Sequence, residues 1–427
     1  MLNAIEIENF KSTSQLELSL GRFNMFIGAN GSGKSTILEA LAFAIASEND
    51  NLNTELLEIR GIRITEPALM RSSFKKTNTD PITVKLYVGE AQVARQYKVN
   101  NSNKEFSDWK VIKDTIIKDA DVEEDFDSDL IEDGNIFSLN KYRQVSSIFD
   151  SINSMINSES FKTLAKDRDF KKHIEELHEL TNSSELKEAK KVFDEMEIDV
   201  NKALVPLKEF AIYSPEYREL RNPYKEGALK PLGINGEGLL KLFRHICLEQ
   251  KDAIEDIEEC LDLIDWFGSI ELPQELDDDL SIEDRFLPIK INQRSTNEGF
   301  LYVLFYSCLV VSDKTPKIFA IDNIDAALNP ALCKELVRII YKLSKKYDKQ
   351  IFITAHNPAV LDGLDLDDEE QALFVVSRSK RNGQTKVTRI NSENKPTVKA
   401  AHKKGETIPL SEAMLRGYIP NALSDGF

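Results

Sequence analysis

The chain has 427 residues, of which 41% are hydrophobic and 30% charged, and its formal net charge is −17. This composition is typical of a globular protein and excludes disordered, fibrous and collagen-like chains. The negative charge does not favour nonspecific binding to nucleic acid, so any DNA contact would need a local basic patch. No apolar run reaches the roughly 18 residues that a membrane span requires, and the four cysteines form no CxxC pair. We therefore expect a cytoplasmic protein with no membrane partner and no disulfide framework.

The N-terminal residues predict two half-buried strands and then a buried one. Ala4–Asn9 and Gln15–Leu20 alternate apolar and polar side chains, which is typical of strands with one buried face. Phe23–Ile27 is a short apolar run. After a glycine-rich segment, Lys34–Ala46 continues as an apolar-rich helix. Strand, glycine loop and helix in this order are the context that a phosphate-binding loop requires.

The glycine-rich segment reads GANGSGKS over Gly28–Ser35 and matches the phosphate-loop pattern GxxxxGK[ST]. Its glycines let backbone N–H groups turn towards phosphates at the N-terminus of a helix, where the dipole favours anions. We expect Lys34 to reach the β- and γ-phosphates and the Ser35 hydroxyl to ligate Mg²⁺. The predicted nucleotide contacts in this segment are Asn30, Gly31, Ser32, Gly33, Lys34, Ser35 and Thr36.

The middle and the last third of the chain differ in pattern. Residues 83–99 predict a hairpin that turns near Gly89, whereas 138–208 and 249–284 are rich in charged helix formers. The last third returns to alternating strands and helices. Its predicted elements are a strand at Lys317–Ile321, a helix at Ala331–Lys346, a strand at Gln350–Thr354, and a hairpin of Ala372–Ser377 with Lys386–Ile390.

A nucleotide site also needs a carboxylate that holds the hydrated metal ion. The apolar strand Lys317–Ile321 runs directly into Asp322, which is the usual position for that acid. The predicted metal ligands are therefore Ser35 and Asp322. Asp322 lies 288 residues after Lys34, so a large segment separates the two parts of one nucleotide site.

Four segments, ENFKS, GANGSGKST, IDNIDAALNP and TAHNP, together resemble the ABC-type ATPases of the RecF and SMC class, in the OLD-like AAA ATPase branch. The resemblance covers residues 1–48 and 285–377. It implies an α/β P-loop ATPase head assembled from both chain ends, with an inserted helical arm. The implied divisions are 1–137 for the N-terminal half of the head, 138–285 for the arm and 286–427 for the C-terminal half. It also implies that ATP and Mg²⁺ are bound and that two heads enclose two ATP molecules, in a homodimer or a higher even oligomer.

The resemblance assigns roles to further residues. Lys11 and Ser12 match a segment that often touches nucleotide phosphate in the family, although a surface strand end is an equal alternative. His356 matches the switch histidine, which contacts the γ-phosphate and the attacking water. The family places a glutamate after the metal-binding aspartate, but this chain has Asn323 there. An amide cannot accept the proton, although it can orient water, so hydrolysis is expected to be slow unless Asp325 substitutes.

The signature segment, which contacts the ATP of the opposite head in the family, also departs from the usual pattern. Residues 293–300 read QRSTNEGF and stand directly before an apolar helix. Asn297 occupies the serine position when the glycines are matched, so the predicted contacts are Asn297, Glu298 and Gly299. A plain helix N-cap at 295–297 is the alternative. For the glutamine loop, Gln144 is a weak candidate.

These features are compared with three possible functions of the chain. The first is an ATP-dependent switch that controls a separately encoded nuclease or toxin-like effector, as OLD-like ATPases often do in bacterial anti-phage defence. Only 71 residues follow His356, too few for an appended nuclease domain. The second is a RecF-like DNA repair or recombination ATPase, with DNA as a partner that the net charge does not indicate. The third, a transporter subunit, is opposed by the wide separation of the two motifs.

Overall fold

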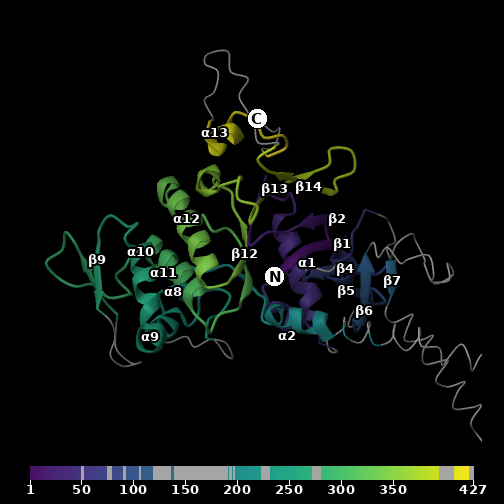
Figure 1. The fold of residues 1–427 in the computed structure, drawn as a ribbon, viewed down its shortest axis with the longest axis horizontal. Coiled ribbons are helices and arrows are strands. Elements are labelled where there is room, and N and C mark those ends of the chain that lie inside the picture. The colour runs from purple at the N-terminus through teal and green to yellow at the C-terminus, as the bar shows by residue number, and fades with distance from the viewer. Residues whose placement is uncertain are drawn as a thin grey trace, which may run out of the picture.

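The computed structural model describes residues 1–49, 52–74, 79–89, 93–104, 107–118, 136–138, 191, 195, 198–222, 231–271, 280–393 and 408–422. Most of the helical segment expected at 138–208 lies outside these residues, as does Gln144. Two six-stranded sheets with helices around them form the described part of the head (Figure 1). Within these residues, no helix combines the length and the apolarity needed to cross a membrane.

The central sheet is built from both ends of the chain. Its strand order is β14-β13-β3-β12-β11-β8, and β3, near the N-terminus, pairs in parallel with both β12 and β13. Only β14 is antiparallel, in a hairpin with β13. The strands are β3 (Phe23–Ile27), β8 (Ile212–Tyr213), β11 (Ile318–Ile321), β12 (Gln350–Thr354), β13 (Gln371–Arg378) and β14 (Thr385–Ile390). The expected α/β head assembled from both chain ends is therefore confirmed.

The second sheet is antiparallel and comes from the N-terminal part of the chain. Its order is β2-β1-β4-β5-β6-β7, and β4 with β5 forms the hairpin expected around Gly89. The strands are β1 (Leu2–Phe10), β2 (Thr13–Ser19), β4 (Ile82–Val88), β5 (Val93–Asn100), β6 (Lys110–Lys118) and β7 (Ile136–Ser138). Helix α1 (Lys34–Ala46) packs between this sheet and the central one, and nearly all of its side chains are buried. A helix that is apolar on all sides requires such a position.

Helices cover the other face of the central sheet. Helix α11 (Glu298–Val311) is buried along almost its whole length, with α12 (Pro330–Lys346), α9 (Leu239–Glu249) and α10 (Ile254–Leu261) around it. In Figure 1 this layer lies to the left of the central sheet, whereas α1 and the antiparallel sheet lie to the right. The remaining short helices are α2 (Thr54–Glu58), α3 (Pro67–Met70), α8 (Tyr217–Leu220), α13 (Leu410–Leu415) and the 3₁₀ turns Val205–Leu207, Lys251–Ala253 and Pro358–Gly363.

Part of the segment expected to form the inserted arm belongs to the head instead. Strand β8 pairs with β11 at the edge of the central sheet, and α9 and α10 share one apolar core with α11. Residues 249–284 are also not helical throughout, because β9 (Phe267–Glu271) and β10 (Ser281–Asp284) pair as a small antiparallel sheet. Strand β8 and helices α9 and α10 therefore pack with the head, and the domain boundaries at 137 and 285 stay a prediction.

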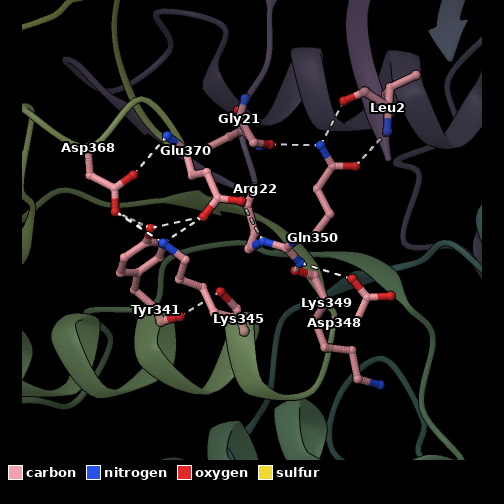
Figure 2. A network of polar contacts seen from close by, with 12 residues as sticks. Leu2, Gly21, Arg22, Tyr341, Lys345, Asp348, Lys349, Gln350, Asp368 and Glu370 are labelled. Carbon is pink, nitrogen blue, oxygen red and sulfur yellow. Dashed lines mark hydrogen bonds and ion pairs between the residues drawn. The ribbon is translucent and has the colours of Figure 1, made fainter. Parts of the chain in front are cut away.

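A polar network joins the two chain ends at the edge of the central sheet where β3 and β12 begin (Figure 2). The Gln350 amide donates to the carbonyl oxygens of Leu2 and Gly21, at 2.7 Å each, and its Oε1 accepts from the Leu2 N–H. Arg22 forms ion pairs with Asp348 and Glu370 at 3.1 Å. These contacts fix the position of the N-terminal strands relative to the C-terminal strands.

We predict that this network weakens in acid through Glu370. Hydrogen bonding by the Lys345 ammonium, 2.7 Å away, holds the pKa of the Glu370 carboxyl below its ordinary 4.5. A depressed carboxyl pKa stabilises the fold above the unfolded-state value, and this contribution is lost as the pH falls. Lys345→Met should therefore reduce the free energy of unfolding at pH 7 by a small amount, because the pair is partly exposed. In urea unfolding, the difference between wild type and variant should shrink as the pH falls below 4.5, and a constant difference from pH 7 into acid would contradict the prediction.

Candidate nucleotide site

The phosphate loop connects β3 to α1 in a conformation that needs its glycines. Gly28, Gly31 and Gly33 have φ angles of +149°, +72° and +111°. A Cβ on Gly28 would lie 2.0 Å from the Val376 carbonyl oxygen, and one on Gly33 would lie 2.4 Å from Thr385 Oγ1. Strands β13 and β14 therefore pack directly against the loop. Only glycine fits at Gly28 and at Gly33.

Two polar groups of the loop are suited to receive phosphate. The Lys34 Nζ donates to the carbonyl oxygens of Gly28 at 2.7 Å and Ala29 at 3.2 Å, and burial lowers its pKa. Ser32 Oγ is buried and has no hydrogen-bond partner among the residues that the structure describes. Ordinarily a buried hydroxyl is satisfied, so an anion in this loop would supply what Ser32 lacks. At the loop tip, Asn30 and Gly31 are more exposed, and Thr36 is buried in the first turn of α1.

The two expected metal ligands lie together although they are far apart in sequence. Asp322 follows β11, and its Oδ1 and Oδ2 accept the Ser35 hydroxyl at 3.0 and 3.1 Å. The Thr354 hydroxyl at the end of β12 also donates to Asp322. One carboxylate and one hydroxyl are the donor set with which P-loop proteins hold a hydrated Mg²⁺. The residues present therefore fit this ion.

The expected switch histidine lies beside the loop lysine. His356 Nδ1 is 3.4 Å from Lys34 Nζ, and burial followed by the Lys34 charge lowers the pKa of His356. Because an ammonium only donates, Nδ1 is the acceptor and Nε2 carries the proton. A neutral imidazole with an N–H to spare can donate a hydrogen bond to the terminal phosphate or the attacking water.

Asp325 holds the backbone of the switch segment. Its Oδ2 accepts the N–H groups of His356 at 3.0 Å and Asn357 at 2.6 Å. Among the described residues, its buried Oδ1 has no hydrogen-bond partner. Burial raises the pKa of the wholly buried Tyr306 on α11, and the charge of Asp325 adds to this shift. These contacts make Asp325 a positioning residue for His356, and they do not favour the alternative in which it acts as the base.

Asn323 has an uncommon backbone conformation. Its φ is +59°, in the left-handed region, and its N–H donates to Thr354 Oγ1 at 2.8 Å. Asparagine tolerates this region better than other residues with a side chain. Asn323, which stands where the resemblance places a glutamate, is therefore a residue type that suits this backbone conformation.

The contacts of Lys11 and Ser12 differ in kind. Lys11 Nζ donates to Glu39 Oε2 and to the Arg63 carbonyl oxygen, both at 2.8 Å, so its charge is already paired with α1. Ser12 Oγ lies 2.8 Å from Thr385 Oγ1, which donates to the Ser32 carbonyl oxygen. Ser12 thus reaches the phosphate loop through Thr385, and Lys11 would have to leave Glu39 to contact a nucleotide.

Sequence reasoning missed two residues here. Thr385 contacts the loop, but a threonine after a hairpin turn carries no motif. Arg63 donates to the buried Glu39 at 2.7 Å, and that hydrogen bond, together with the charge of Asp322, raises the pKa of the guanidinium. The sequence feature that could have indicated Arg63 is the pair of arginines in the segment IRGIR at 59–63.

The expected signature segment lies on the other face of the central sheet from the phosphate loop. Asn297 caps α11, with its Oδ1 accepting the Phe300 N–H at 2.9 Å, so the plain N-cap alternative describes its contacts within one chain. Asn297 and Glu298 are exposed, and a Cβ on Gly299 would approach no atom closer than 3.8 Å. A single chain therefore does not bring this segment to its own phosphate loop (Figure 1).

The chain is similar to known proteins in sequence and in fold. A family model described as "AAA ATPase domain" matches residues 1–361. The chain belongs to this ATPase family. An SMC head bound to the C-terminal winged-helix domain of ScpA is similar in structure, with a TM-score of 0.50 and 13% identity, over 92% of this chain and 98% of that one. This likeness shows the fold of an SMC head.

Two further SMC heads are similar at lower scores. A head with an extended coiled coil bound to the C-terminal domain of ScpA, from Pyrococcus furiosus, has a TM-score of 0.47 and 14% identity over 92% of this chain and 96% of that one. The SMC head domain from Thermotoga maritima has a TM-score of 0.42 and 13% identity over 91% and 99%. Family membership implies nucleotide binding.

We predict that the backbone at Asn323 makes its replacements unequal in stability. Asn323→Gly should leave the free energy of unfolding unchanged or raise it, because glycine adopts a positive φ freely. Asn323→Glu should lower it by about 1 kcal/mol, because the left-handed region is costly for a longer side chain. Denaturant unfolding of the three proteins without nucleotide measures this difference. Equal stability of the Gly and Glu variants would contradict the conformation described.

Proposed function

We propose that the chain is an ATP-dependent switch, whose head pairs with a second copy when Mg²⁺ and ATP bind and thereby controls a separately encoded effector. The observation that carries the proposal is the separation of the phosphate loop from the signature segment. Lys34, Asp322 and His356 meet at the carboxyl edge of the central sheet. The signature segment is exposed at the start of α11, which packs on the face of the sheet opposite α1. A second head can supply that segment to the first, and nucleotide binding is then coupled to the interface.

The chain's own residues suit slow hydrolysis. Lys34 would release its carbonyl partners to hold phosphate, and Ser35 with Asp322 would hold Mg²⁺, which neutralises charge on the phosphates when bound. His356 would donate from Nε2, with its backbone fixed by Asp325. The Asn323 amide can orient a water but cannot take its proton. Such a head favours a long-lived closed state.

The effector and the setting are further parts of this proposal. The resemblance to OLD-like ATPases supports a role in bacterial anti-phage defence with a nuclease or toxin-like effector. The SMC head of the same fold was solved with a domain of ScpA bound to it, which supports a head of this kind carrying a separate protein. DNA-stimulated hydrolysis would instead favour the RecF-like alternative.

The interface is tested with a glycine that has room in the single chain. Gly299→Ala adds a methyl group that meets nothing closer than 3.8 Å, so the variant should fold with equal or slightly greater stability. If Gly299 faces the nucleotide of a second head, the same methyl should weaken ATP-dependent dimerisation about tenfold. Sedimentation with and without Mg²⁺–ATP measures this, and Lys34→Ala should abolish the effect of ATP. Unchanged dimerisation of Gly299→Ala would remove the signature assignment.

Hydrolysis is tested at Asn323 in single turnover. Asn323→Glu should accelerate hydrolysis by about 10²-fold or more, since it restores a group that accepts the proton. Asn323→Gln is the matched control, because it has the length of glutamate without the charge, and its rate should stay close to that of wild type. If both variants are equally slow, Asn323 does not limit the reaction. If wild type itself turns over briskly, the amide at position 323 does not slow hydrolysis and this part of the proposal is wrong.

A further inference from the structure

An open hollow of about 400 Å³ beside the signature segment is lined by arginines. We call it the arginine hollow. Its lining residues are Tyr217, Arg218, Arg221, Asn222 and Arg294. All three arginines are exposed. In a chain with a net charge of −17, the hollow thus gathers three guanidinium groups in one place, although the carboxylates of Glu216 and Glu298 are also exposed nearby.

The hollow offers contacts that suit phosphate groups. The Arg221 guanidinium lies over the Tyr217 ring, 5.6 Å from its centroid, which orients the group without neutralising it. Among the described residues, no carboxylate forms an ion pair with Arg218 or Arg221. Guanidinium groups bind phosphate oxygens in bidentate pairs, and several around one cavity favour a ligand with several phosphates.

The hollow is fixed to the start of α11. The Tyr217 hydroxyl donates to the Thr296 carbonyl oxygen at 3.2 Å, and the Tyr302 hydroxyl on α11 donates to the Pro215 carbonyl oxygen at 2.9 Å. Helix α8 is thereby held against the signature segment, to which Arg294 itself belongs. A ligand in the arginine hollow must therefore lie next to whatever contacts Asn297 and Gly299.

We propose that the arginine hollow binds the phosphate groups of the nucleotide held by the phosphate loop of a second copy of the chain. This inference rests on the proposed function, because it needs two heads that face each other. The hollow belongs to α8 and the start of α11 on one face of the central sheet, whereas α1, which follows the phosphate loop, packs on the other face (Figure 1). We therefore assign the hollow to the nucleotide of the second copy. With Arg218 and Arg221, the hollow thus adds positive charge next to Asn297 and Glu298 of the signature segment.

The direct test is the double variant Arg218→Gln/Arg221→Gln. Sedimentation in Mg²⁺–ATP should show that this variant needs about tenfold more protein to dimerise than wild type. The matched control is Arg285→Gln/Arg338→Gln, which removes two arginines that are also half-exposed but lie elsewhere. It should dimerise like wild type. Equal thermal unfolding of all three proteins shows that the charge changes have not disrupted the fold.

Mixing experiments separate a contact between copies from one within a copy. Lys34→Ala mixed with Arg218→Gln/Arg221→Gln leaves one intact composite site if the hollow serves the partner's nucleotide. Wild type mixed with the triple variant Lys34→Ala/Arg218→Gln/Arg221→Gln then leaves none. With two different tags, Mg²⁺–ATP should pull down more heterodimer from the first mixture than from the second. If the second mixture yields more heterodimer than the first, the proposal is wrong, because the hollow then acts on the nucleotide of its own chain.

Two other outcomes are distinguishable. If wild type does not dimerise in Mg²⁺–ATP, the proposed function fails and this inference falls with it. If wild type dimerises but the Arg218→Gln/Arg221→Gln variant dimerises equally well, the inference alone fails. A nucleic-acid backbone presents the same phosphate chemistry, so anisotropy with a labelled single strand of about 20 nucleotides is measured at low salt. Strand binding that needs Arg218 and Arg221 but no ATP, with both mixtures equal, would assign the hollow to nucleic acid instead.

Discussion

The position of β3 between β12 and β13 is the constraint on which the nucleotide site depends. Phe23 pairs with Ile351 on one side and with Gln371 on the other, so strands separated by more than 320 residues share one register. The carboxyl ends of parallel strands meet at one edge of a sheet, where ligands of such folds bind. The phosphate loop leaves β3 at that edge, and the residues after β11 and β12 meet it there. The network around Gln350 holds the opposite edge, where the strands begin.

This arrangement links the chemistry of the site to the helices of the other face. Asp322 joins Ser35 to Thr354, so the loop, β11 and β12 contact one carboxylate. Three residues later, Asp325 holds the backbone of His356 and acts electrostatically on Tyr306 of α11. One short segment after β11 therefore contacts both the switch histidine and the helix that carries the signature segment. A change in the phosphates bound at the loop could therefore reach α11 through a few packed residues.

The sequence predicted the parts of the fold that carry strong local patterns. The bounds of β3 and α1 match the prediction, because the phosphate-loop motif fixes both its strand and its helix. The meeting of Ser35 with Asp322 also followed, since one hydrated metal ion requires both groups. The membership of β8 in the head could not be predicted, because a strand of two residues has no periodicity and is defined by its pairing with β11. Thr385 was missed for a similar reason: the register of the β13–β14 hairpin brings it to the loop. The positive φ of Asn323 arises from the turn after β11, which residue type alone does not reveal.

The proposed switch depends on the separation of the phosphate loop from the signature segment and the arginine hollow. In the proposal, each head holds a nucleotide with residues from both chain ends, and a second copy supplies its signature segment and arginine hollow to that nucleotide. The free energy of the contact between the two copies would then depend on the phosphates present. In such a design, the rate of hydrolysis sets how long the pair persists. An amide at position 323, in a backbone conformation that favours asparagine, would then slow hydrolysis and lengthen the lifetime of the pair. This is consistent with a head that binds nucleotide first and hydrolyses it later.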